Sequence, residues 1–388
     1  MIPLLLTLPW LALLAFLLFV LKLPRELPGP DVLIGTPTPR VSIIVPARNE
    51  SVNIETCVAS LSRSTYPDFE IIVVDDRSED DTGARARSIP AGNADRILVL
   101  DGAELPEGWL GKPWACAQGA EAAQGDVLLF TDADTTHGVD LLSRSVAGVV
   151  EEEADLLTVL GRQLMGSFWE RLVQPQVFFT MLFRFPDFEK TARNDNWRDA
   201  IANGQFIMMP RSSYERIGGH EAVFDEVVED LALAQVVKRQ GGALRIRSAH
   251  DDLATRMYRS LGELVAGWSK NIFTGGLQSV PRGIRPFMAP IAFLGGVGLW
   301  LLPPLVLLAA VAGLLGADML LWASVVYGIS VVTFGRFTRM MGASAAYGLL
   351  YPLGAAVGTF IFVKSWSGGR TVEWKGRRYE LKDVADRA

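Results

Sequence analysis

The stretch V-L-L-F-T-D-A-D-T, residues 127–135, decides the fold, because an apolar strand runs directly into two carboxylates. Asp132 and Asp134 are separated by one small residue. At the carboxyl end of a buried parallel strand, such a pair lies where open α/β sheets bind their ligands. Mg²⁺ is usually held by one or two carboxylates plus substrate phosphates. Taken alone, the pair is equally consistent with a solvated acidic turn.

Two apolar runs upstream also end in polar side chains. The run at 69–74 leads to Asp75 and Asp76, and the run at 41–45 leads to Arg48. Between the apolar runs lie helical patterns at 52–64, 81–88 and 114–123. Apolar strands alternating with helices predict a parallel, doubly wound α/β sheet that brings these polar residues to one edge. No G-x-G-x-x-G follows any of the strands, so the fingerprint of a dinucleotide-binding enzyme is missing.

Five motifs in order resemble the family-2 nucleotide-sugar glycosyltransferases of GT-A fold. They are V-S-I-I-V-P-A-R-N-E, V-V-D-D-R-S, G-K-P-W-A-C-A-Q-G, T-D-A-D and V-V-E-D-L-A-L, and they fall within residues 40–275. The stretches N-G-Q-F-I-M-M-P and R-M-Y-R-S-L are similar to the membrane-bound ceramide-glucosyltransferase-like and hopene-associated branch. The resemblance implies a mostly parallel GT-A sheet, a nucleotide-sugar donor (UDP-linked by default) and a Mg²⁺ or Mn²⁺ cofactor.

The resemblance also implies roles for individual residues. It places the donor nucleotide sugar around Pro46, Arg48, Glu50, Asp76 and Asp132, the metal ion on Asp134, and a catalytic base at Asp230. A single base without an enzyme nucleophile fits direct, inverting displacement.

Several of these residues also have ordinary structural explanations. Lys112 would add a positive charge near the phosphates, or would cap the start of a helix. Asp75 would cap the turn after its strand. Glu229 and Asp230 stand at the start of an amphipathic helix, where acidic side chains favour the helix dipole. All these alternatives stay open at the level of the sequence.

The end of the catalytic region separates two classes of enzyme. Many processive members of the family carry Q/R-x-x-R-W there, whereas this chain has Arg256, Arg259 and then Ser260. The two arginines are candidates for diphosphate or acceptor contacts, together with Glu229. The missing tryptophan favours transfer of one sugar to a membrane lipid (hopanoid, carotenoid, ceramide or glycerolipid). The alternatives are a processive polysaccharide synthase and a non-catalytic sugar- or nucleotide-binding membrane protein.

The composition excludes several other classes. The chain has 388 residues, a net charge of −6 and 49% hydrophobic residues, and its charges of both signs are mixed, so no nucleic-acid footprint is present. The two cysteines, Cys57 and Cys116, provide neither a disulfide framework nor zinc spacing. His137, His220 and His250 are scattered, and we expect them to be structural.

The N-terminal segment predicts a membrane anchor. Residues 4–21 are almost wholly apolar, and Lys22 and Arg25 follow them. We therefore expect a transmembrane helix at 1–23, a Pro-rich linker at 24–40, and a cytoplasmic catalytic domain at 41–275 on the inner membrane of the cell.

Three further apolar runs follow a connector at 276–289, at about 291–316, 319–334 and 343–363, within a membrane region at 290–363. Three crossings would carry the tail, 364–388, outside, but its basic residues favour the inside. A re-entrant or interfacial helix would remove this conflict. The aromatic stretches at 168–185 and from Leu261 are predicted either to lie in the headgroup plane or to pack in a core.

Overall fold

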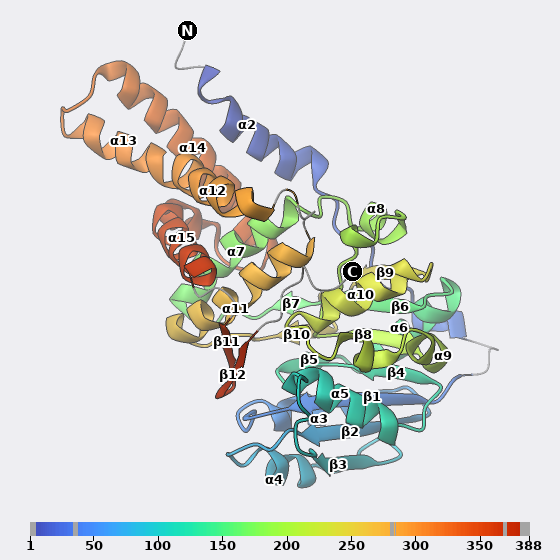
Figure 1. Cartoon of the computed structure of the whole chain (residues 1–388). Helices are drawn as coiled ribbons and strands as arrows, with labels where there is room; N and C mark the ends of the chain where they lie inside the picture. The colour runs from blue at the N-terminus through green and yellow to red at the C-terminus, as the bar shows by residue number, and fades with distance from the viewer. Residues whose placement is uncertain (1–4, 34–37, 280–282, 284, 368–370, 381–388) are drawn as a thin grey trace. The chain divides into compact units, whose positions relative to one another are not determined.

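The computed structural model describes residues 5–33, 38–279, 283, 285–367 and 371–380 (Figure 1). Parts of the expected linker and tail, 34–37 and 381–388, lie outside these residues. The chain forms two compact units that alternate along the sequence. The helical unit consists of Met1–Lys22, Met165–Asp187 and Tyr258–Arg370, and the sheet unit of Leu23–Leu164, Phe188–Met257 and Thr371–Ala388.

This division differs from the continuous ranges that the sequence suggested, 41–275 and 290–363. Residues 165–187 and the segment from Tyr258 onward belong to the helical unit. The reason is that both segments carry aromatic and apolar side chains that pack against the later apolar helices. The last described residues return to the sheet unit.

The sheet unit is built on a seven-stranded sheet with the order β3-β2-β1-β4-β8-β6-β9. Its strands are β1 Val41–Ala47, β2 Phe69–Asp75, β3 Ile97–Asp101, β4 Val127–Phe130, β6 Leu156–Leu160, β8 Ile207–Pro210 and β9 Leu244–Ser248. Only β8 is antiparallel to its neighbours. The mostly parallel sheet is thus confirmed. The edge strand β3 escaped sequence analysis, because it is only half-buried and its apolar run is short.

Helices cover both faces of this sheet. They are α3 Ile54–Leu61, α4 Thr82–Arg87, α5 Gly111–Ala122, α6 Leu141–Glu151, α8 Phe188–Arg193, α9 Arg211–Arg216 and α10 Glu229–Arg239. Ile71 and Val73 of β2 face one core, whereas Ile72 and Val74 face a second core with Ala115 of α5. Because both faces are buried, the strand reads as a continuous apolar run rather than an alternating one. A small second sheet joins β5 Thr135–His137, β10 Leu253–Thr255 and β7 Arg162–Gln163 in that order.

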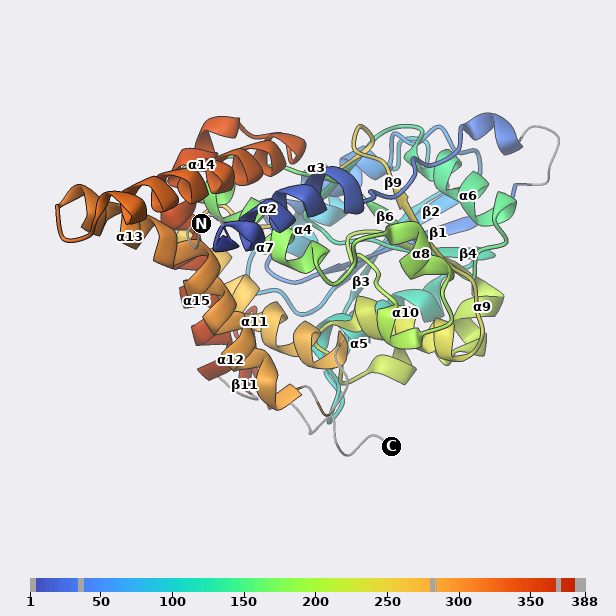
Figure 2. The same ribbon diagram turned by 90° about the horizontal axis from the view of Figure 1, so that it is seen from above.

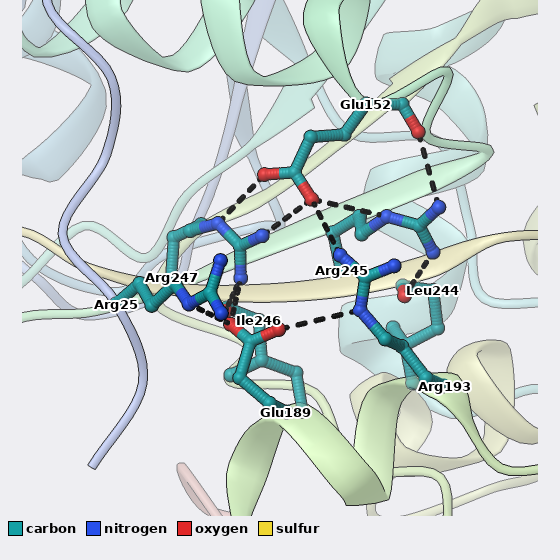
Figure 3. A network of polar contacts seen from close by, with 8 residues as sticks. All are labelled: Arg25, Glu152, Glu189, Arg193, Leu244, Arg245, Ile246 and Arg247. Carbon is teal, nitrogen blue, oxygen red and sulfur yellow. Dashed lines mark hydrogen bonds and ion pairs between the residues drawn. The ribbon is translucent and has the colours of Figure 1, made fainter.

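A network of ion pairs surrounds the edge strand β9 (Figure 3). The guanidinium of Arg247, only 4% exposed, donates a hydrogen bond of 2.7 Å to Glu152 after α6 and lies 2.5 Å from Glu189 of α8. Arg25, in the linker, lies 3.9 Å from the same Glu189. The linker is therefore bound along β9, where it covers an edge that would otherwise expose unpaired backbone groups.

The C-terminal residues form a hairpin of β11 Thr371–Trp374 and β12 Arg377–Glu380. Lys375 and Gly376 form its two-residue turn, with φ angles of 49° and 79°. Two successive positive φ values are the signature of a type I′ turn, whose twist matches that of a β-hairpin, and glycine is favoured there.

The helical unit contains α2 Leu8–Ala15, α7 Phe168–Leu182, α11 Leu261–Ser279, α12 Arg285–Gly295, α13 Leu302–Val311, α14 Ala317–Met340 and α15 Tyr351–Ser367. α13 and α14 lie side by side (Figures 1 and 2). Among the described residues, three helical segments are long and apolar enough to cross a membrane, Phe293–Val311, Ala317–Met340 and Ala345–Ser367. The N-terminal apolar helix reaches only from Leu8 to Val20, about 20 Å at 1.5 Å per residue, so a full span there is weakly supported.

Aromatic side chains form the interior of the helical unit. The ring of Phe179 lies 5.2–5.5 Å from those of Phe334 and Phe337, and Phe334 stacks on Tyr351. On the outside, large apolar side chains such as Leu308 and Leu314 are more than 60% exposed. An apolar exterior of this kind is typical of a lipid-facing surface.

The two aromatic stretches that the sequence left open become α7 and α11. Both helices pack against α15 in the helical unit. Trp268 of α11 is 4% exposed and contacts Phe178 and Tyr258 through its ring. For Trp268, the core-packing explanation is the one that the structure supports.

Candidate active site

The carboxyl ends of β1 and β2 lie next to each other because the two strands are parallel and in register. Ala47 pairs with Asp75, and the backbone N–H of Asp76 donates to the carbonyl of Ala47 at 2.8 Å. Arg48, the next residue of the first strand, is 7% exposed and donates to the carbonyls of Asp76 and Arg77. Arg48 and Asp76 are thus brought together as the sequence predicted, whereas Pro46 remains within β1.

A cavity of about 410 Å³ opens at this point. Its walls are formed by Arg48, Arg77, Glu79, Glu104, Leu105 and Arg377. Three of these six residues are arginines and two are glutamates, and Arg48 and Arg77 lie 3.1 and 4.0 Å from Glu79 and Glu104. The lining is therefore polar, with one more positive than negative charge.

The two aspartates after β2 have different surroundings. Asp75 accepts a hydrogen bond of 3.1 Å from the backbone N–H of Ser78, so it caps the turn. Asp76 is 2% exposed and receives two hydrogen bonds from Arg377. Burial raises the pKa of Asp76, and the guanidinium groups of Arg377 and Arg48 oppose that rise. Arg377 was not among the residues singled out from the sequence.

Lys112, the second residue of α5, lies among acidic side chains. Its Nζ is 2.7 Å from Oδ1 of Asp132 and 2.6 Å from Oε1 of Glu229. Burial alone would lower the pKa of Lys112, but Asp132, Glu229 and Asp230 raise it well above its ordinary value. Lys112 is therefore a fixed positive charge inside the acidic cluster. This position gives it contacts that a lysine at the start of a helix would not need.

Asp134 has a carboxylate oxygen without a partner. Its Oδ1 is buried and accepts no hydrogen bond from the described residues. Burial raises its pKa well above the usual range, and the neighbouring charges of Asp132 and Glu50 add to this effect. A buried, unsatisfied carboxylate that other carboxylates destabilise is suited to a divalent cation. Among the described residues, no group of three or more His, Cys, Asp or Glu side chains is arranged to hold a metal ion by itself.

Asp230 stands in the first turn of α10 and is held by backbone donors. The N–H groups of Gly204 and Leu231 each donate to its carboxylate at 2.7 Å. Burial, followed by the charge of Glu229, raises the pKa of Asp230 to about 6, while Lys112 opposes the rise. A carboxylate with a pKa near neutrality can accept a proton efficiently at physiological pH.

Gly204 is a further residue that the sequence did not single out. A Cβ at this position would lie 3.0 Å from both Oδ2 of Asp230 and Nζ of Lys112. The glycine allows the backbone to approach both charges closely. Its signal was present in the N-G-Q stretch, but only the fold shows why a side chain is excluded there.

The remaining candidates are placed as follows. Glu50 pairs with Lys375 at 2.9 Å, next to Arg48. Arg256 belongs to the sheet unit, whose segment ends at Met257, and Arg259 belongs to the helical unit, whose segment begins at Tyr258. His137 and His220 are buried, and burial lowers the pKa of each to about 3, which agrees with structural roles.

Comparisons of the sequence with known proteins point to glycosyltransferases. Residues 42–218 match the family described as glycosyl transferase family 2. The chain is 27% identical over 359 residues to a 4,4'-diaponeurosporenoate glycosyltransferase of Staphylococcus aureus (strain MRSA252), with 88% of each chain covered.

One solved structure shows the same fold. A mannosyltransferase from Pyrobaculum calidifontis, in complex with GDP-Man and Mn²⁺, superimposes with a TM-score of 0.52 and 20% identity, covering 92% of this chain and 94% of that one. A weaker similarity, with a TM-score of 0.44 and 21% identity, extends to glucosyl-3-phosphoglycerate synthase from Mycobacterium tuberculosis and covers 68% of this chain and 89% of that one.

The mostly parallel sheet, with acidic side chains at its strand ends, has a fold of GT-A type. Residues 42–218 match glycosyl transferase family 2, and the chain as a whole is similar to a protein named as a glycosyltransferase.

Proposed function

We propose that this enzyme transfers one sugar from a nucleotide-sugar donor to the hydroxyl or carboxyl group of a membrane lipid, with inversion at the anomeric carbon. The observation that carries the proposal is the juxtaposition of Lys112, Asp132, Glu229 and Asp230 at one sheet edge. In this arrangement Lys112 supplies a positive charge for the diphosphate, Asp132 a contact for the sugar, and Asp230 the base.

The donor nucleotide occupies the ends of β1 and β2. Asp76 and Glu50 supply acceptors for a base N–H or a ribose hydroxyl, and Arg48 forms the wall beside them. Pro46 shapes the strand end. A uridine-linked donor is the default for the family, and the chemistry of these acceptors is compatible with it.

A divalent cation, Mg²⁺ or Mn²⁺, is held by Asp134. The support is its buried Oδ1 without a partner and its strongly raised pKa. When bound, such an ion neutralises charge on the departing diphosphate. Lys112 adds its fixed positive charge on the same side, and Asp132 faces the ribose or sugar.

Asp230 acts as the base when the acceptor is a hydroxyl. The acceptor oxygen forms a bond to the anomeric carbon as the bond to the diphosphate breaks. The proton passes to Asp230, and the nucleoside diphosphate leaves with the electron pair. The hydrogen bonds from Gly204 and Leu231 hold the carboxylate in position, and its pKa of about 6 keeps it ionised at neutral pH.

The acceptor is a lipid because the chain carries three helices of spanning length and an apolar exterior. The relative from Staphylococcus aureus is named for a carotenoid carboxylate, which supports a polyisoprenoid acid as one acceptor class. We place the sheet unit on the cytoplasmic face of the inner membrane, where nucleotide sugars are made. Arg256 and Arg259 contact the diphosphate or the acceptor.

Incubation of membranes carrying the enzyme with radiolabelled nucleotide sugars, followed by mass analysis of extracted lipids, tests this function. We expect a labelled lipid with one added sugar, absent from membranes with the Asp134→Ala variant. Long sugar chains made from donor alone would contradict the proposal and favour a polysaccharide synthase.

A further inference from the structure

The tip of the C-terminal hairpin contacts the donor side of the site. Arg377 donates two hydrogen bonds to the carboxylate of Asp76, at 2.6 and 3.1 Å. Nζ of Lys375 lies 2.9 Å from Oε1 of Glu50, and the carbonyl of Lys375 accepts a hydrogen bond of 3.1 Å from Arg48. These three partners, Asp76, Glu50 and Arg48, are the residues that the proposed function places around the donor nucleotide.

The geometry of the Arg377–Asp76 pair is that of an orienting contact. Two parallel N–H···O bonds from one guanidinium fix the plane of a carboxylate as well as its charge. The side chains of the pair are 18% and 3% exposed, so the contact is shielded from screening by salt. The carboxylate of Asp76 therefore depends on Arg377 for its orientation and shares the compensating charge of Arg377 with that of Arg48.

The start of α5 encloses the pair from another side. A Cβ on Gly111 would lie 2.7 Å from Nη1 of Arg377 and 2.8 Å from Oδ2 of Asp76. Gly111 directly precedes Lys112, so the hairpin contacts the backbone of the G-K-P-W motif. Arg377 also lines the cavity of about 410 Å³ beside Arg48 and Arg77.

We propose that the hairpin is a working part of the donor site, in which Arg377 positions the carboxylate of Asp76 and completes the wall of the pocket for a nucleoside diphosphate. The inference rests on the proposed function and adds a positioning residue that lies more than 100 residues beyond the last motif of the catalytic region. A hairpin that merely blocked the pocket would have the opposite effect on affinity, which makes the two roles separable.

The test is titration of the full-length enzyme in detergent with UDP in the presence of Mn²⁺. We expect Arg377→Ala to weaken UDP binding by about 10-fold or more, because hydrogen bonds between charged groups are lost from a shielded site. Arg377→Lys keeps the charge but not the pair of parallel hydrogen bonds. Its affinity for UDP should therefore lie between those of the wild type and of Arg377→Ala. In turnover, KM for the donor should rise more than kcat falls.

A double-mutant comparison separates positioning from a general structural role. Because Arg377 acts mainly through Asp76, Arg377→Ala should weaken UDP binding much less in the Asp76→Asn background than in the wild type. The matched control is Arg216→Ala, which removes a half-exposed arginine from an ion pair with Asp155 elsewhere in the sheet unit. We expect this control to bind UDP like the wild type.

The outcomes distinguish the inference from the function on which it rests. Unchanged or tighter UDP binding by both Arg377 variants, with a wild type that binds UDP, would overturn the role of the hairpin alone. A wild-type enzyme that bound neither UDP nor GDP with Mn²⁺ would overturn the proposed donor site, and the inference with it.

Discussion

The ammonium group of Lys112 lies 2.7 Å from Oδ1 of Asp132, which joins the G-K-P-W motif on α5 to the T-D-A-D motif after β4. Glu229 approaches the same ammonium group from α10. Segments that are about 20 and 100 residues apart in the sequence therefore share one positive charge. Removal of one partner from such a cluster leaves a poorly solvated charge without compensation, so its members are energetically coupled.

Removal of the proposed metal ligand should abolish turnover. In Asp134→Ala we expect loss of sugar transfer, because the buried carboxylate that would hold the cation is gone, while the domain stays folded. Assays of transfer with and without a chelator, together with thermal unfolding, check this. Asp101→Ala, which removes an exposed carboxylate from the same unit, is the control. Full activity of chelator-treated wild type would contradict the metal assignment.

Replacement of the proposed base should separate binding from chemistry. Asp230→Asn keeps the size and one of the two backbone hydrogen bonds to the carboxylate but removes basicity. We therefore expect donor binding to survive and transfer to a hydroxyl acceptor to fall by about 10²-fold or more. Glu215→Gln, at an exposed carboxylate, is the control. A carboxylic acid acceptor is already ionised at neutral pH, so with that acceptor the loss should be much smaller. Near-normal transfer to hydroxyl acceptors would mean that Asp230 only stabilises the N-terminus of α10.

The pH dependence of transfer follows from the same residue. A base works only when deprotonated, so with a pKa of about 6 for Asp230, kcat/KM should fall as the pH drops below about 6. Lys112 lowers the pKa of Asp230, and its removal in Lys112→Met should move this acidic limb to higher pH. The measurement is a pH profile of each enzyme. If the fall of kcat/KM occurred at the same pH in both enzymes, Lys112 would have no influence on the pKa of the base.

A methyl group at position 204 should impair transfer. In Gly204→Ala the new Cβ would lie about 3.0 Å from both Asp230 and Lys112, so one of the two charges must shift. We expect a fall in kcat of about 10-fold, since a small misplacement of a catalytic group is costly. The control is Gly29→Ala, at which a Cβ meets no heavy atom within 4 Å. Equal activity of the two variants would show that the close approach is unimportant.

The orientation of the sheet unit can be tested in cells. Lys22 and Arg25, which follow the first apolar helix, favour the cytoplasmic side. A reporter inserted at Gly92, an exposed loop position between α4 and β3, should score as cytoplasmic. A reporter that scored as exported would reverse the assignment.

The predictable part of the site is the part that lies at strand ends. Continuous apolar runs marked β1, β2 and β4, and parallel pairing then placed Arg48, Asp76 and Asp132 at one edge. The residue type alone could not decide between a structural and a functional role for Lys112, because the decision depends on its distance to Glu229, about 120 residues further along the chain. The contacts of Gly204 depend on the same long-range packing.

Arg377 could not be found by pattern analysis, because nothing in a short basic hairpin indicates which carboxylate it contacts. The discontinuous units were hidden for a related reason. The aromatic residues of α7 are as compatible with a soluble core as with a helical membrane unit, and only their packing partners decide between the two.

The return of the hairpin to the sheet unit constrains the path of the chain through the bilayer. The chain leaves this unit after Met257 and rejoins it at Thr371. If the unit lies on one face of the membrane, the number of crossings between these two residues must be even. Three helices of spanning length are an odd number, so either one of them does not cross completely or a further helix of the segment completes a fourth passage. By this parity, we expect the hairpin and the strand ends that it contacts to lie in one and the same compartment.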